Sequence, residues 1–241
     1  MSSRLLSVAH WAGLAILVAS MFSMLPRTAH GAPDGRLIST QGANGGPACM
    51  LCHGAQGEGN PVANFPRLAG AGAAYLQAQL EAIANGSRAS PAMTTIAKIL
   101  EPAQREAVAQ FYAALPLPLD TGRLAATALQ SPKPDDVGAW LAIRGAWDRN
   151  IPACNQCHGP GGIGVGDHFP SLAGQPAAYL AEQLRLWRDN QRPPGPLDLM
   201  ASVATRLTDA EIDAVSAYYA GLPKAADQLA TQTSTAGQAK P

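Results

Sequence analysis

The motif Cys-x-x-Cys-His occurs twice in this chain, and the two copies use all four of its cysteines. In each copy, two thiols can form thioethers with the vinyl groups of a porphyrin, and the adjacent imidazole can bind its iron. The motifs therefore predict two covalently attached haems c, each enclosed by its own stretch of polypeptide. Aromatic residues are only 5% of the chain, so two buried porphyrins would supply apolar volume that side chains do not. The predicted attachment residues are Cys49, Cys52 and His53 in the first copy, and Cys154, Cys157 and His158 in the second.

Other chemistries use cysteine pairs as well. Two copies could together hold one structural zinc, through four thiolates or through two thiolates and two imidazoles. Each pair could also close as a disulfide or act as a redox dithiol. The zinc alternative does not explain why a histidine directly follows the second cysteine in both copies. Redox dithiols usually lie beside a βαβ pattern, and the sequence shows no such pattern.

The sequence around the two motifs repeats at an offset of 104 to 107 residues. Phe-Pro-Arg-Leu-Ala-Gly at 65–70 returns as Phe-Pro-Ser-Leu-Ala-Gly at 169–174, and Ala-Tyr-Leu at 74–76 returns at 178–180. Apolar residues in each copy recur at helical spacing, and no run alternates long enough to predict a sheet. Glu101-Pro102 and the capping box Thr208–Glu211 predict the start of the last helix in each copy, and the second such helix is expected to end before Gly221 and Pro223.

The N-terminus is typical of an exported protein. Arg4 precedes an apolar run from Trp11 to Leu25, and Ala29-His30-Gly31 fits a cleavage site. An uncleaved anchor is the alternative, but this run is shorter than the ~20 residues of a spanning helix. The predicted organisation is a signal peptide at 1–31, a first domain at 32–116, a linker at 117–134, a second domain at 135–223 and a disordered tail at 224–241.

Charge excludes one class of partner. The chain has 17 basic and 17 acidic residues, so it has no basic surplus with which to bind nucleic acid.

The second axial ligand of each iron determines the kind of haem site. A strong side-chain ligand there is typical of an electron carrier, whereas an empty position leaves the iron open to small molecules. Met1, Met21 and Met24 lie in the predicted signal peptide, and Met50 lies between two attachment cysteines. That leaves Met93 and Met200, one per repeat and at similar distances after His53 and His158, in loops between the helices of each repeat. Core packing is the alternative for a lone methionine, but the matching register favours ligation. His168 has no counterpart in the first repeat, and a surface or hydrogen-bonding role suits it better.

Four further residues are candidates from their position. The carbonyls of Pro66 and Pro170 are expected to accept a hydrogen bond from the second ring nitrogen of each ligand histidine. Arg88 and Arg192 follow equivalent helices and could pair with haem propionates, although exposed, solvated arginines are the alternative.

In combination, these motifs resemble the dihaem cytochrome c4 family, over about residues 42–116 and 137–223. The resemblance implies two tandem class I cytochrome c domains, each wrapped around a covalent haem, that face each other across a pseudo-two-fold axis. It also implies His53/Met93 and His158/Met200 as the axial pairs, and it makes the cofactor-binding set Cys49, Cys52, His53, Met93, Cys154, Cys157, His158 and Met200. The chain departs from the family pattern in the longer, Pro-rich segment between Asp189 and Met200.

The function that follows is electron transfer without catalysis. We expect a periplasmic carrier that takes electrons from a quinol–cytochrome c reductase or a dehydrogenase and delivers them towards a terminal oxidase. Peripheral association with the membrane is compatible with this role. One alternative is a cytochrome subunit that serves one particular periplasmic dehydrogenase. Another is a dihaem peroxidase, which would need an open axial site that one methionine per haem argues against.

Overall fold

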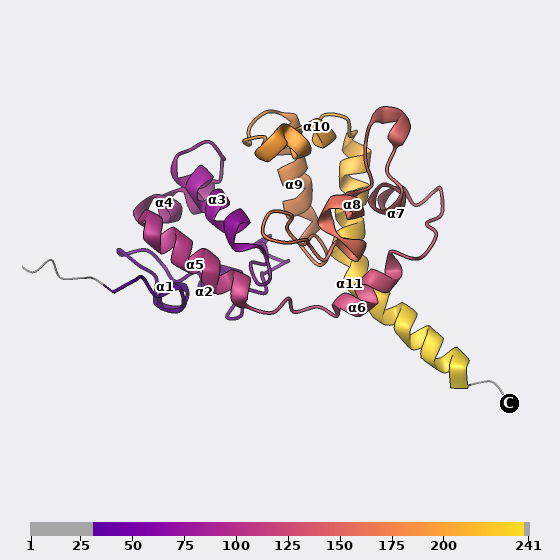
Figure 1. The fold of residues 1–241 in the computed structure, drawn as a ribbon, viewed down its shortest axis with the longest axis horizontal. Coiled ribbons are helices and arrows are strands. Elements are labelled where there is room, and N and C mark those ends of the chain that lie inside the picture. Colours follow the sequence, from indigo (N-terminus) through magenta and orange to yellow (C-terminus); the bar gives the residue numbers. More distant parts are fainter. Residues whose placement is uncertain (1–30, 239–241) are drawn as a thin grey trace, which may run out of the picture. The chain divides into compact units, whose positions relative to one another are not determined.

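The computed structural model describes residues 31–238, and helices are its dominant element (Figure 1). Among these residues, β pairing is limited to three isolated bridges, of which Asn60–Phe65 and Val165–Phe169 lie in equivalent loops of the two repeats. The predicted all-α fold is therefore confirmed. The predicted signal peptide lies outside the described residues, apart from Gly31 at its end. No helix of residues 31–238 combines the length and the apolar character needed to cross a membrane.

The first repeat contains five helices, with α3 packed on α4 and α5, and α1 packed on α5. Pro102 opens α5, and Glu101 and Gln104 form a capping box there, so the predicted start of this helix is confirmed. The five helices are α1 (Gly35–Gln41), α2 (Met50–His53), α3 (Ala73–Ala84), α4 (Pro91–Ile99) and α5 (Pro102–Ala114).

The second repeat has an equivalent order, in which α11 packs on α7 and α9. The predicted capping box is confirmed, because Thr208 and Glu211 each accept a hydrogen bond from the other's backbone amide. The elements are α7 (Val137–Ile143), η1 (Trp147–Arg149), α8 (Cys154–His158), η2 (Pro160–Gly162), α9 (Ala177–Arg188), η3 (Pro196–Asp198), α10 (Leu199–Ala204) and α11 (Asp209–Gln238).

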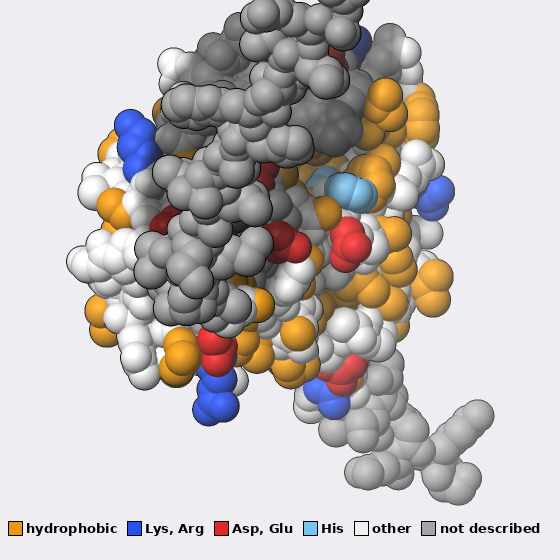
Figure 2. All heavy atoms as spheres, turned by 60° about the vertical axis from the view of Figure 1, so that its left-hand side comes forward, with side chains coloured by type: hydrophobic (Ala, Val, Ile, Leu, Met, Phe, Trp, Pro, Cys, Tyr) orange, Lys and Arg blue, Asp and Glu red, His pale blue; other side chains and the backbone are white. Residues whose placement is uncertain are grey.

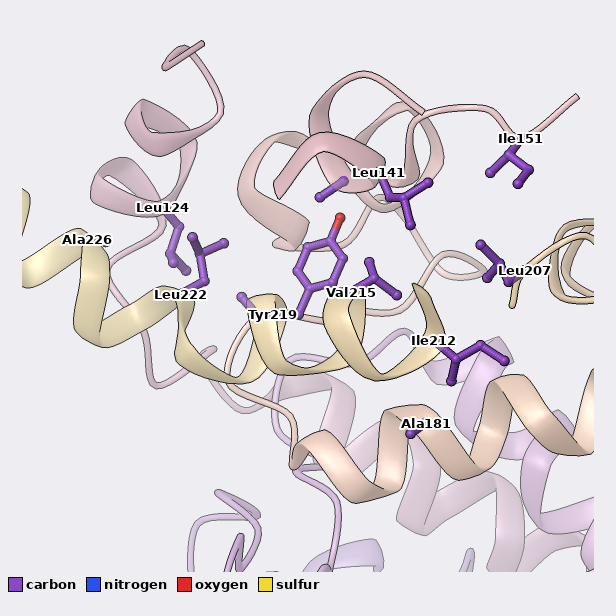
Figure 3. Close-up of a cluster of buried hydrophobic side chains, with 12 residues drawn as sticks. Leu124, Leu141, Ile151, Ala181, Leu207, Ile212, Val215, Tyr219, Leu222 and Ala226 are labelled. Atoms are coloured by element: carbon purple, nitrogen blue, oxygen red, sulfur yellow. The ribbon is translucent and has the colours of Figure 1, made fainter. Parts of the chain in front are cut away.

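Each repeat has its own hydrophobic core. The first is built around Leu76, Val108 and Tyr112. The second, larger core is drawn in Figure 3, where Tyr219, Val215 and Ile212 project from α11 towards the other elements. Two separate cores of this kind indicate two domains, each with its own buried apolar surface.

The end of α11 differs from the expectation. We expect a helix that stops before Gly221 and a disordered tail from 224, but α11 continues to Gln238 with Pro223 inside it. Proline removes the hydrogen bond to the carbonyl four residues earlier. That carbonyl belongs to Tyr219, and it accepts a hydrogen bond from the Gly174 amide instead, at 2.8 Å. The proline therefore leaves no unpaired carbonyl, which removes one reason for the helix to end.

The predicted linker also contains structure. Residues Thr121–Thr127 form α6, which Asp120 caps by accepting a hydrogen bond from the Arg123 amide. Leu124 of α6 is buried with Leu222 and Ala226 of α11 (Figure 3). Because α6 covers this apolar face, part of the predicted linker and part of the predicted tail extend the second core.

Candidate functional site

The two attachment motifs lie at the short helices α2 and α8. Cys49 is the N-cap of α2, which contains Cys52, and α8 contains both Cys154 and Cys157, so the cysteines of each pair lie within about one helical turn. All four cysteines are free and partly buried. Burial raises the pKa of the Cys49 thiol, and it raises the pKa of the Cys154 thiol to about 11. Burial therefore favours the neutral thiol at Cys49 and Cys154, and none of the four described sulfurs is tied up in a disulfide, so all four are free to form thioethers to a haem.

The two histidines have matching surroundings. His53 and His158 are both buried, and burial lowers the pKa of each imidazole. Nδ1 of His53 lies 2.8 Å from the carbonyl oxygen of Pro66, and Nδ1 of His158 lies 2.8 Å from that of Pro170. The two predicted carbonyls are thus confirmed. Since a carbonyl can only accept, Nδ1 carries the proton and donates, which leaves the lone pair of Nε2 for iron.

The loops that carry these carbonyls are fixed by the last helix of each repeat. In the first repeat, the amides of Leu68 and Ala69 donate to the Gly57 carbonyl, and a Cβ on Gly57 would lie 2.7 Å from the Tyr112 ring. Gly162 and Tyr219 repeat this arrangement in the second, where the corresponding distance is 2.5 Å. A side chain larger than hydrogen would displace the tyrosine, so glycine is required for the close approach.

The zinc alternative has no support in the described residues. Within 31–238, no three His, Cys, Asp or Glu side chains come together as a metal site. The histidine set instead suits haem iron, one nitrogen ligand per motif, with the cysteines left for the porphyrin. His168 is exposed, which agrees with the surface role expected for it.

Met93 and Met200 lie near the start of α4 and α10, so both belong to short helices where loops are expected. Both side chains are partly buried. Their equivalent positions in the two repeats are compatible with a shared role, and their ligation of the two irons stays a prediction.

Arg88 and Arg192 are not surface residues: their side chains are 7% and 4% exposed. Arg88 of the first repeat donates to Gln183 at 2.8 Å, and Arg192 of the second donates to Gln79 at 2.8 Å. These contacts run in both directions between the repeats. We call this group the arginine cluster; it consists of Tyr75, Gln79, Arg88, Tyr179, Gln183 and Arg192.

The arginine cluster holds two buried cations and no carboxylate. Among the described residues neither arginine forms an ion pair, and Nε of Arg88 has no hydrogen-bond partner. Buried charges are normally compensated by an opposite charge or by acceptors. The propionates of a haem would supply both, so these residues fit the cofactor. The cluster is also asymmetric, because Arg192 stacks 3.7 Å from the centre of the Trp187 ring, whereas Ile83 is the equivalent residue of the first repeat.

Two functional candidates escape the sequence analysis. Arg67 and Gln175 are buried, and they join the repeats. Arg67 has Ser171 as its counterpart in an otherwise repeated hexapeptide, and this single mismatch is the signal that marks it. Gln175 has no such signal, because a glutamine after a glycine is ordinary in a loop.

Comparison with known proteins agrees with this arrangement. The model of the cytochrome c family matches twice, at residues 46–115 and 152–222. The thiosulfate dehydrogenase electron acceptor of Stutzerimonas stutzeri is 45% identical over 88% of this chain and 95% of its own length. Cytochrome c4 of Pseudomonas aeruginosa is 32% identical over 86% of this chain and 98% of its own.

Solved structures show the same two groups. A thiosulfate dehydrogenase from Marichromatium purpuratum in its as-isolated form has a TM-score of 0.66 and 41% identity, covering 77% of this chain and 39% of that longer chain. Reduced cytochrome c4 from Pseudomonas stutzeri has a TM-score of 0.59 and 34% identity, covering 72% of this chain and 92% of its own.

Proposed function

Because this chain belongs to the cytochrome c family and is a dihaem member related to cytochrome c4, we propose that it is the electron acceptor of a periplasmic thiosulfate dehydrogenase. It is an electron-transfer protein with two covalent haems c, and not an enzyme. The donor and the periplasmic location are the proposed part. In this role the protein takes electrons from the dehydrogenase and passes them to a later carrier or a terminal oxidase.

The observation that carries this choice of donor is the difference in similarity. The relative named as an acceptor of thiosulfate dehydrogenase is 45% identical across nearly its whole length, against 32% for the cytochrome c4 of comparable coverage. The structural neighbours rank in the same order. This chain matches only 39% of the Marichromatium chain, which is named a thiosulfate dehydrogenase. A similar pair of domains is thus part of a longer dehydrogenase chain there, which supports the proposal that the pair serves one dehydrogenase.

Haem c supplies the iron that alternates between two oxidation states, and the chain prepares the site for it. His53 and His158 would each hold an iron through Nε2, and the carbonyls of Pro66 and Pro170 orient the two rings. We propose that Met93 and Met200 would supply the second protein ligand of each iron, where a thioether would favour the reduced state. Their constant presence would exclude oxygen and peroxide from both irons.

The face drawn in Figure 2 carries both hydrophobic and charged side chains that a partner could contact. On the uncovered part of the face in Figure 2, charged side chains are scattered among hydrophobic ones. Leu51, between the first pair of cysteines, and Val62 are both strongly exposed. Contacts with the dehydrogenase are therefore expected to depend more on apolar surface than on salt-sensitive charge pairs.

A general carrier fed by a quinol–cytochrome c reductase is the second candidate, and the cytochrome c4 relatives favour it. The two are separated by rapid-mixing spectroscopy of the oxidised holoprotein. Catalytic thiosulfate dehydrogenase with thiosulfate should reduce both haems faster than it reduces a cytochrome c4 tested in parallel. Equal rates for the two proteins, or faster reduction by the quinol–cytochrome c reductase, would favour the general carrier.

A further inference from the structure

The repeated Phe-Pro-x-Leu-Ala-Gly loops of the two domains contact each other, and they differ at one position. Arg67 follows Pro66 in the first loop, and Ser171 follows Pro170 in the second. The guanidinium of Arg67 crosses to the other loop, where it donates to Ser171 Oγ at 3.1 Å and to the Ala173 carbonyl at 2.9 Å. One side chain of the first domain thus fills the space that the shorter serine leaves in the second.

Arg67 is a buried cation with no anion beside it. Its side chain is 4% exposed, and its acceptors are a hydroxyl and two carbonyls, the second being that of Ala69 at 3.0 Å. No carboxylate forms an ion pair with it among the described residues, and its Nε has no hydrogen-bond partner. Burial lowers the pKa of the guanidinium to about 10, so the group remains charged at neutral pH. A positive charge in such a place is only weakly screened.

The backbone of Arg67 is fixed as firmly as its side chain. Its amide donates to Oε1 of Gln175 at 2.9 Å, and its carbonyl accepts from Nε2 of the same residue at 3.0 Å. The cation cannot move towards solvent without breaking bonds to both loops. Its position relative to the two loops is therefore constant.

Both loops carry, at their second residue, the carbonyl that orients the ligand histidine of their domain. Pro66 is bonded directly to Arg67 and accepts from His53, while Pro170 is bonded directly to Ser171 and accepts from His158. The residue that carries this charge follows Pro66 in its own domain, and its guanidinium donates to Ser171, the residue that follows Pro170 in the other domain. No second charged residue occupies a corresponding place, because the repeat has serine there.

We infer that Arg67 acts on both haem sites as a fixed cation at the domain contact, and that its charge raises the reduction potentials of both. The reason is electrostatic: a nearby positive charge favours the ferrous state, which carries one positive charge less than the ferric state. The effect concerns the reduction potentials of the two haems, which the proposed choice of electron donor does not address. It holds whether or not thiosulfate dehydrogenase is the partner.

The test is a spectroelectrochemical titration of the holoprotein, which resolves two midpoint potentials. Arg67→Met removes the charge but keeps an apolar stem, and both potentials should fall, so that several-fold less protein is reduced at a fixed ambient potential. Arg67→Lys keeps the charge and should retain most of the wild-type values. Gln175→Ala removes two hydrogen bonds to the Arg67 backbone, but the guanidinium keeps its bonds to Ser171, Ala69 and Ala173. The charge therefore stays in place, and both potentials should remain close to wild type.

Three results would overturn the inference. One is a folded Arg67→Met protein, low-spin at both haems, whose potentials are unchanged. Another is a shift confined to one haem, which would remove the shared role. The last is a Gln175→Ala protein that reproduces the full shift, since the contact and not the charge would then be responsible. If Arg67→Met does not accumulate with both haems, Arg67→Gln removes the same charge while keeping polar atoms, and it decides the question by the same criteria.

Discussion

A single backbone carbonyl decides the tautomer of each ligand histidine. His53 and His158 are buried, which favours the neutral ring, and each donates from Nδ1 at 2.8 Å to a proline carbonyl. Proline restricts the φ angle of the residue that carries this carbonyl, which removes one of the two backbone rotations that could turn it away. The same residue type at the same point of both repeats therefore gives two iron ligands with the same tautomer.

The axial methionines yield the first prediction. Met93→Ala and Met200→Ala should each open one haem to carbon monoxide, because alanine cannot replace a thioether ligand. Reduced protein with and without carbon monoxide is compared by absorption difference spectroscopy, and one haem per chain should respond in each variant. Met50→Ala, between the attachment cysteines, is the matched control and should bind none. A silent Met93→Ala or Met200→Ala would mean that its ligand is another residue.

At the scale of elements, the start of α11 depends on one ion pair. Glu211 closes the capping box with Thr208 and also binds Arg149 of η1. The hydrogen bond from Arg149 is the main reason that the pKa of Glu211 falls from 4.5 to about 2. A carboxyl whose pKa is depressed in the folded state stabilises that state above the unfolded pKa, and this contribution is lost as the pH falls towards the folded value.

Glu211→Gln should therefore lower the free energy of unfolding at pH 7 by about 1 kcal/mol, a value that allows for the partial exposure of Arg149. The loss should shrink as the pH falls from 4.5 to about 2. Urea unfolding followed by circular dichroism at several pH values measures it. Glu106→Gln on the exposed side of α5 serves as the control. A deficit that stays constant across this pH range would show that the charge of Glu211 is not its source.

The contact of α6 with α11 gives a prediction within the segment expected to be a linker. Leu124 is 1% exposed, so Leu124→Ala should leave a cavity and lower the free energy of unfolding by about 2–5 kcal/mol. Leu129, two residues beyond α6, is 85% exposed, and Leu129→Ala should change the free energy of unfolding by less than about 0.5 kcal/mol. Chemical unfolding measures both. Equal effects would mean that α6 does not pack on α11 in solution.

At the scale of the whole molecule, the two domains meet through polar groups, while each keeps a separate apolar core. Arg88, Arg192 and Arg67 are buried at this contact and share amide, hydroxyl and carbonyl acceptors across it. Hydrogen bonds are directional, so a contact of this kind fixes orientation more strongly than an apolar one. Constant orientation suits electron transfer between two centres, whose rate depends on their separation.

The double variant Arg88→Met, Arg192→Met should keep both haems but loosen the domain contact. Gln79 and Gln183 each accept from both arginines, so the double substitution leaves both amide oxygens without these buried donors and weakens the pairing of the repeats. Limited proteolysis is expected to cleave segment 117–134 faster than in the wild type. Arg185→Met, whose arginine pairs with Asp209 and Asp213 at the surface, is the matched control. Unchanged cleavage in the double variant would show that the arginine cluster is not needed for the contact.

Much of this protein is determined by local sequence. The attachment chemistry depends on five consecutive residues, so the cofactor and its proximal histidine follow from the two motifs. The starts of α5 and α11 follow from capping residues, and Pro66 and Pro170 follow from a repeated dipeptide. These features are local because bonds within a few residues decide them.

The tertiary structure decides the features that involve distant residues. Pro223 predicts a helix end, yet α11 continues because the Gly174 amide satisfies the carbonyl that proline leaves free and Leu124 covers the next turn. Arg88, Arg192 and Arg67 would be surface residues by their type, and only the pairing of the two domains buries them. The sequence thus determines what each half binds, whereas the folded pair determines which charges lie beside the two centres, since burial and screening depend on neighbours far away in the chain.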